Sequence, residues 1–263
     1  MASQKFGALQ ALILDMDGVL WKGSELIVDL KTLFMRIEAL GLSVTLATNN
    51  ATLPVEHYLQ KFSDHGVSLE AWQITTSALA AAYFLKKRYP DSGPVFVIGE
   101  SGLVSALEQQ GFYQAEEGVV AVVAGLDRTI SYEKLRKASI LIQNGADFIG
   151  TNPDKNLPMP EGLVPGAGAL QAVLETTTGI APTIIGKPQT VMYEQLLERL
   201  KVIPQKTLVV GDRLDTDIAG AQTIGARSAL VLSGSTSRAQ AEVWRPSPDL
   251  IAVDICAVID EIG

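Results

Sequence analysis

The chain has few of the side chains that form disulfide bonds or zinc sites. Its 263 residues include one cysteine, Cys256, and two histidines, His57 and His65. A single cysteine cannot form a disulfide bond within the chain, and the chain has neither four cysteines nor three histidines for a zinc site of either kind. A bound metal ion would therefore be held mainly by oxygen atoms.

The chain also lacks an excess of positive charge and a long hydrophobic run. It has 21 Lys and Arg residues against 29 Asp and Glu residues, a net charge of −8. We therefore expect no nucleic-acid partner and no anionic membrane partner. The longest apolar window, residues 119–126, is less than half of the roughly 18 residues that span a membrane. Since the first 14 residues show no signal-peptide pattern, we expect a cytoplasmic protein.

Hydrophobic residues make up 47% of the chain and recur in short runs separated by segments with helical spacing. Runs rich in β-branched and aliphatic residues lie at 11–14, 43–47, 95–98, 119–123, 183–185, 207–210 and 228–232. Such runs predict buried strands. Their alternation with helices predicts an α/β fold with a doubly wound parallel sheet, in which functional groups gather at the carboxyl ends of the strands.

Acidic residues follow two of the predicted strands. Asp15 and Asp17 end the first run, and side chains two positions apart on an extended chain point to the same side. Two carboxylates held together require a cation or a shared proton, and either is useful in phosphate chemistry. The segment after run 207–210 adds three more carboxylates: Asp212, Asp215 and Asp217.

Groups that suit a phosphate anion follow two other strands. Thr48, Asn49 and Asn50 offer a hydroxyl, amides and main-chain N–H groups near a predicted helix start, and Lys187 offers an ammonium group. Taken singly, these residues are typical of helix caps and surface loops. Their joint occurrence with the acidic residues, each just after a predicted strand, favours magnesium-assisted phosphoryl transfer.

At this level the sequence resembles the haloacid dehalogenase (HAD) superfamily, and within it the branch of NagD-type, p-nitrophenyl phosphate and pyridoxal phosphate phosphatases. Four motifs carry the resemblance, in the family's order: Asp15-Met-Asp-Gly-Val-Leu20, Thr48-Asn-Asn50, Gly186-Lys-Pro188 and Gly211-Asp-Arg-Leu-Asp-Thr-Asp217. The resemblance covers nearly the whole chain. It implies a HAD-like Rossmannoid core.

The resemblance also implies a role for each acidic residue. Asp15 would be the nucleophile that takes the phosphoryl group, and Asp17 the general acid and base. Mg²⁺ would be bound by Asp15, by the main-chain carbonyl of Asp17 and by Asp212. Asp217 and Asp215 would orient these metal ligands.

The remaining motif residues would bind the substrate. By the same resemblance, Thr48, Asn49 and Asn50 would hold phosphate oxygens. Lys187 would neutralise the substrate and hold Asp15 in place.

The spacing of the motifs locates an insertion. Between Asn50 and Lys187 there are 187 − 50 = 137 positions, enough for a separate domain. We predict a catalytic core at residues 1–75 and 179–263, with an α/β cap domain of the C2 type at residues 76–178. The cap would exclude water and select the substrate. The resemblance further implies a homodimer formed through the cap.

These features predict a Mg²⁺-dependent phosphoric monoester hydrolase that acts on small phosphate monoesters through an aspartyl phosphate. Two alternatives stay open: a phosphoacceptor signalling module, and a ligand-binding protein without activity on the same scaffold. Two interpretations of Trp21 are equally open as well. It could form a flap against the leaving group, or be an exposed side chain that packs on the cap.

Overall fold

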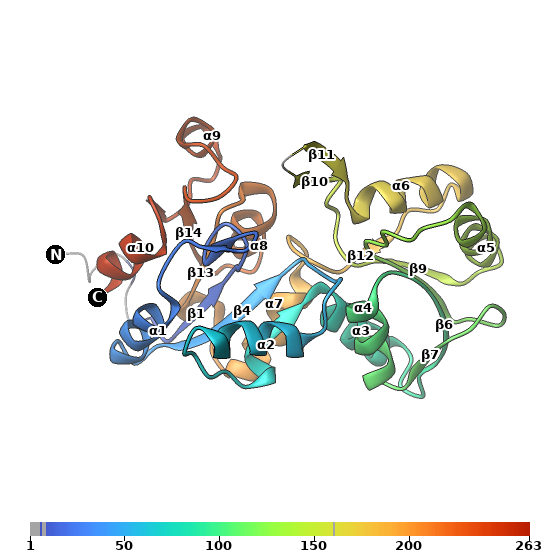
Figure 1. Ribbon diagram of the computed structural model, residues 1–263, viewed down its shortest axis with the longest axis horizontal. Helices are drawn as coiled ribbons and strands as arrows, with labels where there is room; N and C mark the ends of the chain where they lie inside the picture. The colour runs from blue at the N-terminus through green and yellow to red at the C-terminus, as the bar shows by residue number, and fades with distance from the viewer. Residues whose placement is uncertain (1–5, 7–8, 160) are drawn as a thin grey trace. The chain divides into compact units, whose positions relative to one another are not determined.

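The computed structural model describes residue 6, residues 9–159 and residues 161–263, and it shows an α/β protein (Figure 1). The chain forms two compact units. The first comprises the described part of Met1–Thr48 together with Glu56–Thr75 and Tyr193–Gly263, and the second comprises Asn49–Val55 and Thr76–Met192.

The first unit is built on a six-stranded sheet with the strand order β15-β14-β13-β1-β4-β5. β1 lies near the middle and pairs in parallel with β13 on one side and with β4 on the other. All four residues of β1 are buried, as expected for a central strand of a parallel sheet. The strands are β1 Ala11–Leu14, β4 Ser43–Thr48, β5 Ile74–Thr76, β13 Thr207–Gly211, β14 Arg227–Val231 and β15 Leu250–Ala252.

Helices of this unit begin and end where the sequence supplies the appropriate residues. α1 (Leu30–Ala39) starts after Asp29, whose side chain accepts a hydrogen bond from the Thr32 N–H, and it buries an apolar face against the sheet. α1 lies beside α10 (Figure 1). The other helices are α2 Val55–Asp64, α7 Thr190–Leu200, α8 Ala219–Thr223, α9 Arg238–Val243 and α10 Ile255–Ile262.

A tight turn and a short hairpin follow β1. The Met16 carbonyl accepts hydrogen bonds from three successive N–H groups, those of Val19, Leu20 and Trp21. Gly18 adopts a φ of +80°, which L-residues with a side chain rarely adopt. β2 (Trp21–Lys22) and β3 (Glu25–Leu26) then pair as an antiparallel hairpin.

The second unit contains a parallel sheet of five strands in the order β12-β9-β8-β6-β7. α5 and α6 pack together against this sheet over a core that includes Phe96, Val122, Phe148 and Leu174 (Figure 1). Its strands are β6 Gly93–Ile98, β7 Phe112–Gln114, β8 Ala121–Ala124, β9 Asp147–Gly150 and β12 Thr183–Ile184. Its other elements are α3 Ser77–Arg88, α4 Ser101–Gln109, α5 Tyr132–Gln143, α6 Ala167–Thr178 and the antiparallel hairpin of β10 Asn156–Met159 and β11 Gly162–Pro165.

The fold class expected from the sequence is confirmed, and each of the seven predicted runs overlaps a strand. One strand, β12, does not join the sheet of the predicted core. β12, at residues that the domain prediction assigns to the core, pairs with β9 of the second unit. A two-residue strand carries too little pattern to show which sheet it joins.

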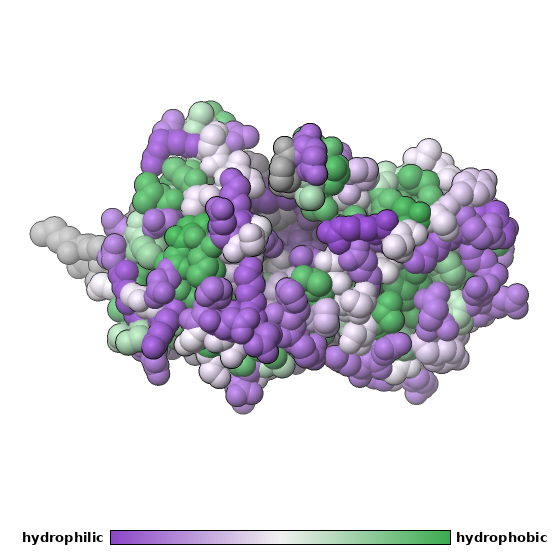
Figure 2. Space-filling view, viewed as in Figure 1, coloured by the Kyte–Doolittle hydropathy of each residue, from purple (hydrophilic) through white to green (hydrophobic). Residues whose placement is uncertain are grey.

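The surface mixes polar and apolar residues. On the face shown in Figure 2, hydrophilic side chains separate the hydrophobic patches. Within the described ranges, none of the helices is both long and apolar enough to cross a membrane.

Candidate active site

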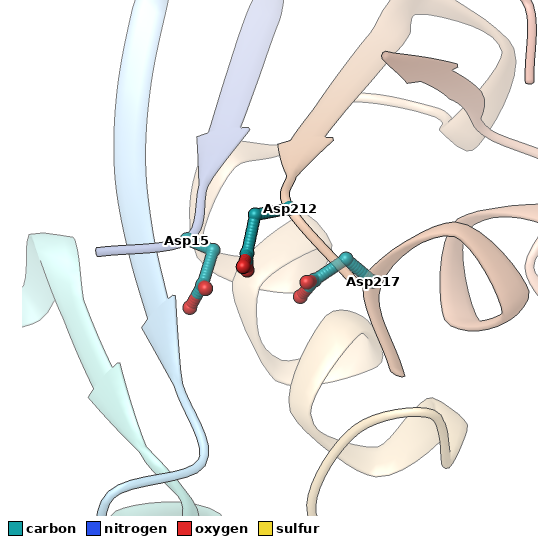
Figure 3. Close-up of side chains that lie close together, drawn as sticks. All are labelled: Asp15, Asp212 and Asp217. Atoms are coloured by element: carbon teal, nitrogen blue, oxygen red, sulfur yellow. The ribbon is translucent and has the colours of Figure 1, made fainter. Parts of the chain in front are cut away.

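Asp15 and Asp212 meet because the strands that precede them are neighbours. Leu14 lies opposite Val210 in the β1–β13 register, and the Asp15 N–H donates to the Val210 carbonyl at 2.9 Å. Asp217 joins them from the π-helical turn Leu214–Ile218 that follows β13. Figure 3 shows the three side chains close together, and one carboxylate oxygen from each lies within 4.8 Å of the others.

Glycines make this close approach possible. A Cβ atom at Gly234 would lie 2.0 Å from Asp212 Oδ2, and one at Gly18 would lie 2.5 Å from the same oxygen. A Cβ atom at Gly211 would lie 2.2 Å from the Cβ of Asp217. Real Cβ atoms do not approach other atoms so closely, so these positions admit no larger residue without movement of the acidic side chains.

The donor set fits a divalent metal ion. Asp15, Asp212 and Asp217 are 7%, 3% and 1% exposed, so their mutual repulsion is only weakly screened by water. Carboxylate oxygens are hard ligands of the kind that Mg²⁺, Ca²⁺ and Mn²⁺ prefer. These three residues could therefore hold such an ion, which would offset most of the repulsion.

The structure separates two acidic residues that the sequence grouped together. Asp217 lies in the three-carboxylate group, and its Oδ2 also accepts the Arg213 N–H at 3.1 Å. The Asp215 side chain is 66% exposed and forms an ion pair with the Arg213 guanidinium at 2.9 Å. Burial raises the pKa of Asp215, but hydrogen bonds from Arg213 outweigh this and the pKa is lowered overall.

Asp17 occupies a different environment from the three buried carboxylates. Its side chain is exposed, and within the described residues it stands outside the three-carboxylate group. Its Oδ1 accepts a hydrogen bond from the indole Nε1 of Trp21 at 3.1 Å. Trp21 itself is 2% exposed, so the interpretation of this residue as an exposed side chain is wrong.

The second motif contributes residues to both units. Thr48 ends β4, next to β1 in the first unit, and is 3% exposed. Asn50 lies in the second unit. Its Oδ1 accepts hydrogen bonds from the Thr52 N–H at 2.9 Å and from the Thr52 hydroxyl at 2.7 Å, which closes a turn before α2.

Asn49 is joined to Lys187 within the second unit. Asn49 Oδ1 accepts the Lys187 N–H at 2.8 Å, and Asn49 Nδ2 donates to the Lys187 carbonyl at 3.0 Å. The side-chain amide thus pairs with the main chain of Lys187 as a neighbouring strand would. A Cβ atom at Gly186 would lie 2.6 Å from Asn49 Oδ1, so the glycine before Lys187 makes room for this pairing.

Two residues near Asp17 escaped the sequence analysis. Tyr58 on α2 is 4% exposed, and its buried hydroxyl has no hydrogen-bond partner among the residues that the structure describes. Burial, reinforced by the charges of Asp17 and Asp15, raises the pKa of this hydroxyl. Lys61, one turn further along α2, places its Nζ 3.6 Å from the centre of the Trp21 ring. The spacing of Tyr58 and Phe62 indicates only a buried helix face, since sequence does not show where a hydroxyl points.

Comparison with known proteins agrees with this geometry. Models of a haloacid dehalogenase-like hydrolase family and of a related HAD-hydrolase-like family match residues 12–113 and 184–258. The acid sugar phosphatase of Staphylococcus saprophyticus is 34% identical over 96% of this chain and 98% of its own. The crystal structure of a 4-nitrophenylphosphatase from Thermotoga maritima superimposes with a TM-score of 0.92 at 30% identity, covering 100% of both chains. The structure of a p-nitrophenyl phosphatase from Archaeoglobus fulgidus superimposes with a TM-score of 0.91 at 28% identity, covering 97% of this chain and 99% of the other.

The chain therefore belongs to the haloacid dehalogenase-like hydrolases. Within them it is a phosphatase of the branch that holds the NagD-type and p-nitrophenyl phosphatases. The relatives match along nearly their whole length. They favour an enzyme over a phosphoacceptor module or a ligand-binding protein without activity.

The pairing of Asn49 with Lys187 gives a prediction about stability. Asn49→Ala removes both hydrogen bonds and leaves a main-chain N–H and carbonyl of a residue that is 3% exposed without these partners. We expect the free energy of unfolding to fall by about 2 kcal/mol in urea titrations. The control is Asn144→Ala, at an exposed asparagine of the same unit. We expect this substitution to change the free energy of unfolding by less than about 0.5 kcal/mol. Equal effects of the two substitutions would contradict the prediction.

Proposed function

We propose that the protein is a Mg²⁺-dependent phosphatase that hydrolyses small phosphate monoesters through an aspartyl phosphate on Asp15. The observation that carries the proposal is the buried group of Asp15, Asp212 and Asp217 at the end of the central strands. A nucleophilic carboxylate beside a metal-binding pair is the arrangement that transfer of a phosphoryl group to an aspartate requires.

The donor set supports the proposed metal requirement. We propose that Asp15, Asp212 and the main-chain carbonyl of Asp17 bind Mg²⁺, with Asp217 supporting them. When bound, the ion would offset most of the negative charge of the carboxylates and polarise the phosphoryl group. Without it, three carboxylates and a phosphate dianion would repel one another.

Two aspartates perform the bond changes. A carboxylate oxygen of Asp15 attacks phosphorus, and the bond from phosphorus to the alcohol oxygen breaks while Asp17 gives that oxygen its proton. Asp17, now ionised, takes a proton from a water molecule, which attacks the phosphorus of the aspartyl phosphate. The bond to Asp15 breaks, phosphate leaves, and both carboxyl groups return to their starting states.

The other motif residues hold the transferred group. We propose that the Thr48 hydroxyl and the amides at Asn49 and Asn50 bind phosphate oxygens, and that Lys187 supplies positive charge. The Asn49 side chain already pairs with the main chain of Lys187. We therefore propose that Asn49 binds the phosphate through its main-chain N–H.

Residues 76–178 would act as the cap that selects among small phosphate monoesters. Two relatives are named for sugar phosphate and 4-nitrophenyl phosphate hydrolysis, so both ester types belong in a first substrate panel. Dimerisation through this cap is part of the same proposal.

The nucleophile is tested by Asp15→Asn. An amide is a poor nucleophile toward phosphorus, so turnover of p-nitrophenyl phosphate should fall by at least about 10³-fold. Mass spectrometry after rapid acid quench should find a phosphorylated Asp15 peptide in the wild type and none in the variant. A wild-type rate in Asp15→Asn would remove the basis of the proposal.

The metal site is tested by a matched pair in one turn. Asp217→Asn removes a charge from the buried group, whereas Asp215→Asn removes one from an exposed ion pair. We expect Asp217→Asn to raise the Mg²⁺ concentration for half-maximal activity by about tenfold and Asp215→Asn to change it by less than about twofold. If the two Mg²⁺ titrations coincide, the assignment of Asp217 is wrong.

The general acid is tested by Asp17→Asn with esters of different leaving groups. An alkoxide needs a proton to depart far more than p-nitrophenolate does. In single-turnover experiments, phosphoryl transfer from a sugar phosphate should therefore slow by about 10²-fold or more, and transfer from p-nitrophenyl phosphate much less. Equal slowing of the two esters would show that Asp17 is not the general acid.

A further inference from the structure

The side chain and main chain of Trp21 are both fixed to the loop that carries Asp17. The indole Nε1 donates to Asp17 Oδ1 at 3.1 Å. The Trp21 N–H donates to the Met16 carbonyl at 3.3 Å, and the Trp21 carbonyl accepts the Gly18 N–H at 2.7 Å. The hydrogen bond to Asp17 therefore starts from an anchored residue.

Helix α2 holds the indole ring in place. The centres of the Phe62 and Trp21 rings are 5.4 Å apart, at an interplanar angle of 57°. Phe34 of α1 packs on Phe62, with the two ring centres 5.6 Å apart. The Lys61 ammonium lies 3.6 Å from the centre of the Trp21 ring. With Trp21 2% exposed and Phe62 fully buried, the ring has little freedom to turn away from Asp17.

From this arrangement we propose that Trp21 is a positioning residue that sets which oxygen of Asp17 carries the transferred proton. The inference rests on the proposed role of Asp17 as general acid and base. An indole N–H can donate a hydrogen bond but cannot accept one. Asp17 Oδ1 is thereby kept as an acceptor, and the proton that passes to the leaving oxygen belongs on Oδ2.

The proton balance is the same in both half-reactions. The Oδ2–H bond breaks as the bond from phosphorus to the leaving oxygen breaks, and it forms again when the attacking water gives up its proton. Oδ1 remains bonded to Trp21 throughout. The carboxyl group therefore does not need to rotate between the two steps.

Lys61 strengthens this hydrogen bond. A cation over the face of an indole is attracted to the ring electrons and draws density away from the ring edge, where the N–H lies. Trp21 thus connects a positive charge on α2 with the negative charge of Asp17. The charge of Asp17 also acts on Lys61, where it opposes the lowering of the pKa that burial causes.

The decisive variant is Trp21→Phe, which keeps an aromatic ring against Phe62 and removes the N–H donor. The matched control is Trp244→Phe, which removes another indole hydrogen bond of the same unit, from Trp244 Nε1 to Gln222 Oε1 at 3.3 Å. Single-turnover phosphoryl transfer is measured for p-nitrophenyl phosphate and for a sugar phosphate in both variants and in the wild type.

We expect Trp21→Phe to slow transfer from the sugar phosphate by about tenfold, part of the 10²- to 10⁴-fold that a general acid contributes, and transfer from p-nitrophenyl phosphate by less than about threefold. Trp244→Phe should leave the ratio of the two rates unchanged. A purely structural role of Trp21 would slow both esters equally, and that result overturns the proposal.

A second variant and a direct measurement test the proposal even if Trp21→Phe does not fold. Lys61→Met keeps an apolar stem over the ring and removes the charge, so it should lower the same ratio by about threefold. In the metal-free protein, the indole N–H proton resonance of Trp21 should move upfield in Asp17→Asn, while that of Trp244 stays. An unchanged Trp21 resonance would overturn the proposal without any activity being measured.

The outcomes separate this inference from the function on which it rests. If Asp17→Asn slows both esters equally, the acid role fails and the role of Trp21 fails with it. If Asp17→Asn discriminates between the esters and Trp21→Phe does not, the acid role stands and the inference about Trp21 alone is wrong.

Discussion

The parallel pairing of β1 with β13 is the constraint on which the site depends. Because Leu14 and Val210 lie opposite each other, Asp15 and Asp212 leave the sheet at the same edge, and the turn after β13 adds Asp217. Two unit charges 4 Å apart near a protein surface repel by roughly 4 kcal/mol. The buried, hydrogen-bonded sheet offsets this cost. A cation at the site would lower it, so folding brings the three carboxylates together where a metal ion could bind.

The carboxylates and the phosphate-binding residues are positioned by different means. Close packing helps position two of the buried aspartates, since Asp212 lies in the space beside Gly18 and Gly234, and Asp217 lies beside Gly211. Hydrogen bonds of single side chains position the other groups. The Asn49 amide aligns the main chain of Lys187, and the Trp21 indole aligns the Asp17 carboxylate. Each of these three hydrogen bonds involves at least one motif residue.

The limits of sequence reasoning follow from the same distinction. The strand ends that bear Asp15 and Asp212 could be predicted, because buried runs have a recognisable pattern and motif residues follow them directly. The difference between Asp215 and Asp217 could not, since it depends on a π-helical turn that directs one carboxylate inward and the other toward Arg213. The Tyr58 hydroxyl, unpaired among the residues that the structure describes, could not be predicted either, because a buried helix face has the same sequence pattern whether or not its polar atoms are paired. The sheet that β12 joins depends on partners far away in the sequence.

The exposure of the four aspartates matches the tasks proposed for them. Asp15, Asp212 and Asp217 are at most 7% exposed, which limits competition from water for a metal ion and strengthens its attraction. Asp17 is exposed, as a group must be where an alcohol departs and a water molecule enters. Exposure has a consequence for geometry, however, because an exposed carboxylate is free to sample several rotamers. Burial restricts the other three aspartates, and main-chain N–H groups of Ser235 and Arg213 also donate to Asp212 Oδ2 and Asp217 Oδ2. The exposed one needs a hydrogen bond from a rigid donor, and the buried indole of Trp21 is such a donor.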